Sequence, residues 1–301
     1  MAITIQTLNI ARDDFEAFRD EHWDNLPDQY SAYCQMLNDR QKDFRAKEVS
    51  SVGLPAATAE GAPYHSDSRR ALYEKTWEYV KYTHTLELTD EAQYTDQFGT
   101  FSKNEMEVVK AFKQNRNLQY ANLFNRAWDS GYTGPDGLVL AHTAHTTNGG
   151  TTFANEPATH AALDPYEFMD GRTSIRTTRD SRGRRMYLTP TVCLIVPPEL
   201  EYTAREIIQA EKMPYTGDNT PVTYNSNVEV HVMDEITVTD FWGIIPKETM
   251  ENPFFMVDRM PFSVEADREV RNGVGILAAH EEYLVGWHLP YRTWLVSVTE
   301  G

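Results

Sequence analysis

Residues 102–128 form the longest stretch of helical periodicity in this chain of 301 residues, and this stretch constrains the fold most. Side chains of one stripe recur at spacings of three and four: Val109, Phe112, Arg116, Tyr120, Leu123 and Ala127. Lys110, Lys113 and Gln114 fall on the opposite, solvent-facing side. Ser102-Lys103-Asn104-Glu105 matches a capping box, which places the helix start at Ser102. At 1.5 Å per residue such a helix is about 40 Å long, so we predict a strut.

Shorter elements indicate a mixed α+β fold. Asp164-Pro165-Tyr166-Glu167 predicts a helix start, with Asp164 as the cap. Residues 191–196 form a β-branched and apolar run typical of a buried strand, and residues 228–232 alternate as in a half-buried strand. Residues 274–298 predict two or three strands broken at Gly286 and Pro290. Helices and strands in this order favour an α+β architecture.

Two segments are candidates for arms. Residues 11–30 are acidic and carry an aromatic stripe at helical spacing with Phe15, Phe18 and Trp23. This pattern is typical either of a solvated helix on its own domain or of an arm that reaches a neighbouring copy. Residues 47–67 are rich in small residues, Gly and Pro, as in a hairpin tip, and residues 73–88 predict one long strand that is polar on both faces. Such a strand is not expected at the centre of a sheet, so we predict an arm that projects from the body. Its charged residues include Arg69, Arg70, Lys75, Glu78 and Lys81.

Composition excludes several classes of protein. The chain is 41% hydrophobic, as in ordinary globular proteins, and its net charge of −17 disfavours a dedicated nucleic-acid binder. Two cysteines, Cys34 and Cys193, make no disulfide framework and indicate folding inside a cell, although a single bridge between them stays open. We find no signal peptide and no apolar run long enough for a membrane helix, and we expect a soluble chain.

The sequence contains no recognised catalytic motif. His142, His145 and His160 lie near a loop rich in Gly, Thr and Asn, and the first two could share a metal ion with Asp136. Chance spacing in a loop explains the same pattern. We expect no catalytic residue, metal or cofactor, and we keep a metal-dependent hydrolase that uses these histidines as an alternative.

An arginine cluster reverses the sign of the local charge. Six arginines fall within 14 residues, with Asp180 as the only acid among them: Arg172, Arg176, Arg179, Arg182, Arg184 and Arg185. One interpretation is a solvated helix face and turn. The other is a patch that contacts an acidic surface of another copy or an anionic ligand, because the planar guanidinium pairs with carboxylates through two hydrogen bonds.

Several ordered blocks resemble one protein family. They are Leu86-Glu87-Leu88-Thr89-Asp90-Glu91-Ala92, the helix end Leu123-Phe124-Asn125-Arg126-Ala127-Trp128, Gly134-Pro135-Asp136-Gly137-Leu138, residues 190–200, and Asp240-Phe241-Trp242. Together they resemble tailed-bacteriophage major capsid proteins of the Hong Kong ninety-seven fold, in the branch related to Mu-like major head subunits.

The resemblance implies a division of the chain into regions. Residues 1–45 would be an N-terminal arm, and residues 46–88 an extended loop that lies over a neighbouring subunit. Residues 89–162 and 247–301 would form the peripheral domain, with a spine helix at about 102–128. Residues 163–246 would form the axial domain.

The resemblance also implies a function. The chain would be a structural major capsid protein, not an enzyme, that assembles into hexamers and pentamers of an icosahedral shell enclosing double-stranded DNA. Its partners would be further copies of itself and scaffold, portal and decoration proteins, with no specific nucleic-acid binding and no membrane. It would be made in the host cytoplasm and reside in the virion capsid. The charged residues of the extended loop and the arginine cluster are the candidate interface residues. An encapsulin-like shell of a cellular compartment is an alternative with the same fold.

Overall fold

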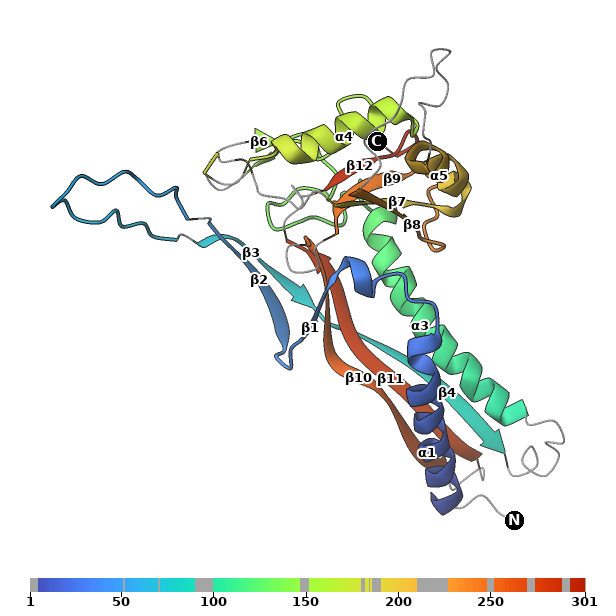
Figure 1. Cartoon of the computed structure of the whole chain (residues 1–301). Coiled ribbons are helices and arrows are strands. Elements are labelled where there is room, and N and C mark those ends of the chain that lie inside the picture. The colour runs from blue at the N-terminus through green and yellow to red at the C-terminus, as the bar shows by residue number, and fades with distance from the viewer. Residues whose placement is uncertain are drawn as a thin grey trace.

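The computed structural model shows an elongated molecule built on two sheets (Figure 1). It describes residues 5–50, 52–69, 71–89, 100–146, 152–179, 182–183, 185, 191–209, 227–247, 252–269, 274–288 and 293–300. A long helix runs beside the first sheet and meets the second sheet at its C-terminal end. The α+β expectation is confirmed.

The first sheet has the strand order β1-β10-β11-β4. The long strands β10 (Phe254–Glu269) and β11 (Val274–Trp287) pair antiparallel through its centre. β1 (Gln35–Asn38) pairs parallel with β10, and β4 (Val80–Thr89) pairs antiparallel with β11. β4 is an edge strand, which explains why it tolerates exposed polar side chains along most of its length.

Two helices lie on one face of this sheet. α3 (Thr100–Asn125) follows the sheet lengthwise, and α1 (Ile5–His22) packs against β10. Phe15 of α1 is buried and stacks on Phe262 at a centroid distance of 6.0 Å. The first segment is therefore a helix docked on its own chain. The short 3₁₀ helices η1 (Trp23–Asn25) and η2 (Ser31–Tyr33) connect α1 to β1.

A separate hairpin carries the projecting arm. β2 (Asp43–Val49) pairs antiparallel with β3 (Ala71–Glu78), and residues 52–69 extend beyond it (Figure 1). This differs from the single strand predicted over residues 73–88. The strand is interrupted at Tyr79. β3, which pairs with β2, ends before this residue, and β4, which pairs with β11, begins after it. Both halves have β-forming composition, and only the change of partner separates them.

The second sheet has the order β12-β9-β7-β8. β7 (Val192–Val196) is central and buried on both faces, between β9 (Trp242–Pro246) and β8 (Val228–Val232). The predicted buried strand and half-buried strand are both confirmed. β12 (Trp294–Val296) pairs with β9, so the last strand joins this sheet. We had expected all strands of residues 274–298 to belong to the peripheral domain. β11 also continues through Gly286 to Trp287 instead of ending at the glycine.

Helices cover the second sheet. α4 (Pro165–Thr177) and α5 (Glu201–Gln209), which follows the 3₁₀ helix η3 (Pro198–Leu200), pack on it around a core that includes Trp242. Asp164 caps α4 by accepting 2.8 Å hydrogen bonds from the amides of Tyr166 and Glu167, as predicted. A two-stranded ladder pairs β5 (His145–Thr146) with β6 (Thr152–Phe153).

The start of α3 differs from the capping-box prediction. The helix begins at Thr100, so Ser102 lies within it. Glu105 is buried, and the nearby Asp14 of α1 acts on it electrostatically. The sequence pattern matched a cap because it contained the right residue types, but the tertiary contact with α1 gives Glu105 a different environment.

Cys34 and Cys193 are both buried free thiols, so the bridge left open by the sequence is not formed. Burial raises the pKa of Cys34 to about 12, which keeps its thiol protonated. Within the described ranges, we find no helix whose length and apolar character would suit a membrane crossing.

Candidate assembly interface

The base of the arm is fixed to the body by aromatic packing. Phe44 of β2 and Trp77 of β3 contact Phe255 of β10, with ring centroids 5.2 Å and 5.9 Å apart. Gly286 permits this approach, because a Cβ atom there would lie 2.9 Å from Phe255 and 3.0 Å from Trp77. The face of the first sheet opposite α3 is thus occupied by the hairpin through a core of its own.

Lys75, one of the predicted interface residues, is used inside the arm base. Its ammonium lies 4.1 Å from the ring centre of Trp77 and 5.7 Å from that of Trp287, and it donates to the carbonyl of Thr133. Burial lowers its pKa. These contacts tie the arm to its own body, so Lys75 acts first as an intrachain residue.

The distal part of the arm has almost no contact with the body. Every residue from 54 to 69 is exposed, including Leu54 and Tyr64, whose exposed fractions are 69% and 94%. Burying these side chains against another molecule would be favourable. The prediction of a projecting arm therefore holds for the β2–β3 hairpin and its tip.

Arg182 of the arginine cluster reaches the arm. Its Nη1 lies 2.8 Å from Oδ2 of Asp67, and its Nη2 lies 3.1 Å from Oδ1 and 2.9 Å from the carbonyl oxygen of Ser68. From the sequence we had interpreted the cluster either as a solvated face or as a patch for another copy or an anionic ligand, and nothing in the sequence selected Asp67 of the same chain.

The rest of the cluster is dispersed. Arg172 is half-buried on α4, and burial together with the charge of Arg176 lowers its pKa. Arg179 donates a 2.7 Å hydrogen bond to the carbonyl of Gly183 and forms an isolated β-bridge with Arg185. Arg176, Arg179 and Arg185 are exposed. Arg184, like Arg70 of the arm, lies outside the described residues.

Arg69, Glu78 and Lys81 complete the predicted set. All three are exposed, and none forms an ion pair within the part of the chain that the structure describes. Arg69 follows the residues that contact Arg182, Glu78 ends β3, and Lys81 lies at the free edge of β4. Their availability for contact with another copy stays a prediction.

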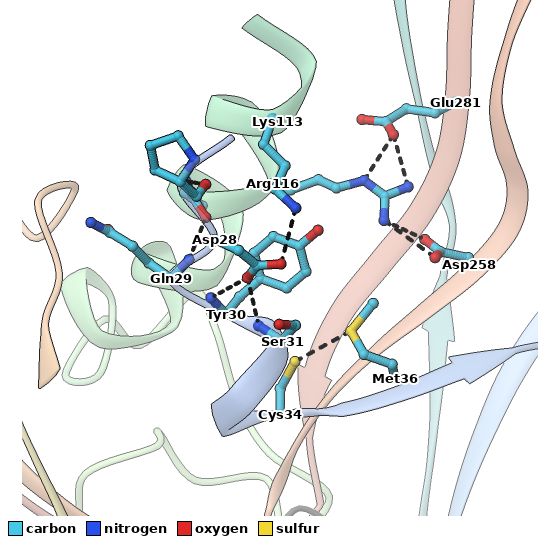
Figure 2. A network of polar contacts seen from close by, with 12 residues as sticks. Asp28, Gln29, Tyr30, Ser31, Cys34, Met36, Lys113, Arg116, Asp258 and Glu281 are labelled. Carbon is cyan, nitrogen blue, oxygen red and sulfur yellow. Dashed lines mark hydrogen bonds and ion pairs between the residues drawn. The ribbon is translucent and has the colours of Figure 1, made fainter. Parts of the chain in front are cut away.

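A buried polar network that sequence reasoning missed positions the N-terminal segment (Figure 2). Arg116 of α3 pairs with Glu281 of β11 at 2.8 Å and with Asp258 of β10 at 3.1 Å. Lys113, predicted on the solvent face, is instead buried and pairs with Asp28 at 2.9 Å. Arg116 within an apolar stripe was the available signal, because a buried guanidinium requires an anionic partner.

Asp28 is held as a carboxylate. Burial opposes its ionisation, but the amide of Ser31 and the ammonium of Lys113 outweigh burial and lower its pKa. The amides of Tyr30 and Ser31 both donate to its Oδ1, at 3.1 Å and 2.9 Å (Figure 2). The turn after α1 is therefore fixed to the long helix.

The three histidines have structural partners. Nδ1 of His145 lies 2.6 Å from Asp136, and its Nε2 lies 3.3 Å from the carbonyl of Leu140. His142 accepts from the amide of Ala144 at 3.0 Å, and His160 lies 3.4 Å from Glu156. Among the described residues, no group of three or more potential metal ligands is assembled. His145 and Asp136, which the alternative of a metal-dependent hydrolase would use as metal ligands, instead contact each other and close the loop after α3.

The structure combines a projecting arm with exposed apolar side chains, a charged loop beside it and a strut helix. Comparison with known proteins identifies the family that has this arrangement. A sequence model described as phage capsid protein matches residues 74–293. The chain belongs to the phage capsid protein family. No curated protein sequence matches this capsid protein. The family and the fold are those of a structural shell protein.

Solved structures agree with this assignment at the level of the fold. A chain of Microbacterium phage Oxtober96 has a TM-score of 0.53 at 8% identity, covering 93% of this chain and 98% of that one. The capsid of a native GTA particle has a TM-score of 0.58 at 10% identity, covering 89% of both chains. A virus-like particle from Pyrococcus furiosus has a TM-score of 0.55 at 6% identity, covering 95% of this chain and 98% of that one. The capsid protein thus has the Hong Kong ninety-seven fold, and the Mu-like branch stays a prediction.

Proposed function

We propose that this major capsid protein assembles into hexamers and pentamers of an icosahedral shell that encloses double-stranded DNA. The observation that carries the proposal is the arm: residues 54–69 are exposed throughout and include two large apolar side chains. A chain that displays such a surface gains stability by burying it against another molecule, and identical copies supply that contact in a symmetric shell.

The proposed division into regions follows the two sheets. We assign the first sheet with α1 and α3 to the peripheral domain, the second sheet with α4 and α5 to the axial domain, and the hairpin β2–β3 with its tip to the extended loop. β12 pairs in the second sheet, which moves residues 294–296 from the peripheral to the axial domain. β4 belongs to the peripheral sheet, so the extended loop ends near Glu78.

Charge supports a role as a container. The net charge of −17 has the same sign as packaged DNA, so the shell does not adhere strongly to its contents. Scaffold, portal and decoration proteins, and synthesis in the host cytoplasm, belong to the same proposal. The family match is to phage capsid proteins, so it does not favour the encapsulin-like alternative.

The test is assembly of the purified protein. We expect closed shells in electron micrographs of the overexpressed chain, alone or with a co-expressed scaffold. A variant in which residues 54–66 are replaced by a short Gly-Ser linker should remain folded, because these residues bury nothing in their own chain, yet fail to form shells. Normal shells from this variant would show that the arm is not the assembly contact.

A further inference from the structure

Asp67 connects three parts of the molecule that the sequence keeps apart. Its Oδ2 accepts a 2.5 Å hydrogen bond from the amide of Gly53, on the opposite side of the arm. Both of its oxygens face the guanidinium of Arg182, which lies 115 residues away in the loop after α4. Arg182 also donates to the carbonyl oxygen of Ser68. One carboxylate therefore joins the two sides of the arm to each other and to the body.

This junction lies where the regular hairpin has ended. The last paired residues of β2 and β3 are Val49 and Ala71, and beyond them no ladder is formed among the described residues. The distal residues 54–66 are exposed and belong to no hydrophobic cluster. Without a further contact, a segment of this kind would sample many directions, and fixing it would cost conformational entropy.

We propose that Asp67 and Arg182 form an intrachain latch that holds the arm of each unassembled copy in the direction in which it meets a second copy. The inference rests on the proposed assembly function and adds to it the residues that position the arm. Arg182 then serves its own chain, in contrast to the interchain role expected for the arginine cluster.

The geometry favours a persistent latch over a weak, transient surface contact. Exposed ion pairs contribute little when single and flexible, but a bidentate guanidinium–carboxylate pair is directional. The side chains of Arg182 and Asp67 are only 29% and 19% exposed. The amide of Gly53, followed by Arg182, lowers the pKa of Asp67, so the carboxylate is ionised at neutral pH.

Gly53 shows independently that the junction is closely packed. A Cβ atom at this position would lie 2.9 Å from Oδ2 of Asp67 and 3.2 Å from Nη1 of Arg182. A residue with a side chain would therefore push the carboxylate or the guanidinium out of place. Gly61, at the tip of the same arm, has open space around its Cβ position, so the close approach is local to the latch.

A preorganised arm lowers the cost of association. Ordering a flexible segment when two copies meet subtracts from the binding free energy, whereas a segment already held in place does not incur that loss. The latch is therefore expected to lower the protein concentration at which shells begin to form. It leaves the apolar tip free, because its contacts involve Gly53, Asp67, Ser68 and Arg182 and none of the residues 54–66.

The first test measures the latch in the unassembled chain, below the assembly concentration. Hydrogen exchange at the amide of Gly53 should be slow in the wild type and at least about tenfold faster in Asp67→Ala, since that variant removes the acceptor. Arg182→Gln should accelerate the same exchange. Glu60→Gln in the arm and Arg185→Gln in the cluster are the matched controls and should leave it unchanged. Fast exchange in the wild type, or no response to Arg182→Gln, would overturn the latch.

The second test measures assembly. The critical concentration should rise roughly three- to tenfold in Asp67→Ala, in Arg182→Gln and in Gly53→Ala, as expected for the loss of one preorganising contact. The double variant of Asp67 and Arg182 should be no worse than either single one, because both act through one contact. An unchanged or lower critical concentration would refute the proposal. If the wild type forms no shells under any condition, the assembly function fails, and the exchange experiment still decides whether the latch exists.

Discussion

Arg116 and Glu281, 165 positions apart in the sequence, form a buried ion pair with Nη2 and Oε2 separated by 2.8 Å. The side chain of Glu281 is fully covered, and that of Arg116 is 6% exposed. The pair joins the strut helix α3 to the central strand β11, and Asp258 on β10 adds a second anion (Figure 2). The helix is therefore attached to the sheet by charge as well as by apolar packing, which fixes its position along the strands.

Removing one member of this pair should destabilise the fold strongly. Arg116→Met leaves the Glu281 carboxylate buried without its cation, and we expect the free energy of unfolding to fall by about 3–5 kcal/mol. Urea denaturation of the unassembled chain measures the loss. The double variant Arg116→Met with Glu281→Met should recover a substantial part of it. A double variant as unstable as the single one would show that the charge of Glu281 is not the cause.

The stability of the capsid protein should depend on pH through Glu105. Burial, and then the negative charge of Asp14, raise the pKa of Glu105 from 4.5 to about 7. Between these two values the folded chain binds more protons than the unfolded chain, so the contribution of Glu105 to stability falls as the pH rises through this window. Glu105→Gln should raise the free energy of unfolding at pH 7.5 by on the order of 2 kcal/mol and have little effect at pH 4.5.

The measurement is urea denaturation of both proteins at a series of pH values. Glu107→Gln is the control, because Glu107 lies two positions away on α3 with its side chain 69% exposed. Parallel stability profiles for the wild type and Glu105→Gln between pH 5 and 7.5 would contradict the prediction.

The close packing at Gly286 should be essential for the base of the arm. Gly286→Ala places a methyl group within 3.0 Å of Phe255 and Trp77, and overpacking of this kind costs about 1–3 kcal/mol. We expect a lower melting temperature and a change in the fluorescence of Trp77. Gly131→Ala is the control, because its Cβ would meet only the exposed side chain of Asp129, at 3.2 Å or more. Equal stability of the two variants would disprove the packing argument.

Charge reversal in the arginine cluster should affect assembly and spare the fold. Arg176 and Arg179 are exposed, so Arg176→Glu with Arg179→Glu should leave the unfolding transition of the unassembled chain almost unchanged. Shell yield in electron micrographs should fall at least about tenfold if the patch meets acidic surface on another copy. The double lysine variant keeps the charge and should assemble. Normal shells from the glutamate variant would refute this interface.

The histidine loop should respond to loss of Asp136 and not to chelators. Asp136 accepts from His145, whose side chain is fully buried, so Asp136→Ala should lower the free energy of unfolding by about 1–3 kcal/mol. We expect no stoichiometric zinc in the purified protein and no change in its melting temperature with a chelator. Stoichiometric zinc that is lost in Asp136→Ala would instead support the alternative of a metal site at these histidines.

Local sequence pattern determined much of the secondary structure. The strut helix, the cap at Asp164 and the buried strand 192–196 follow from short-range periodicity and side-chain chemistry, which act over a few residues. The projecting segment was predictable for the same reason, because residues 47–67 are small, contain Gly and Pro and have little to bury. The packing of Trp77 on Phe255 at the base of the arm was not predicted. Ordered blocks of residues then indicated the family.

Only the tertiary structure decided which distant residues meet. The pairing of β12 with β9, the burial of Lys113 and the contacts of Arg116 with Glu281 and of Arg182 with Asp67 depend on residues far apart in the sequence. A buried charged residue needs a partner of opposite charge. The chain contains 45 Asp and Glu residues, and the sequence alone does not show which of them pairs with a given buried cation. The partners are fixed when the long helix packs against the sheets, because this packing sets the distances between the charged groups.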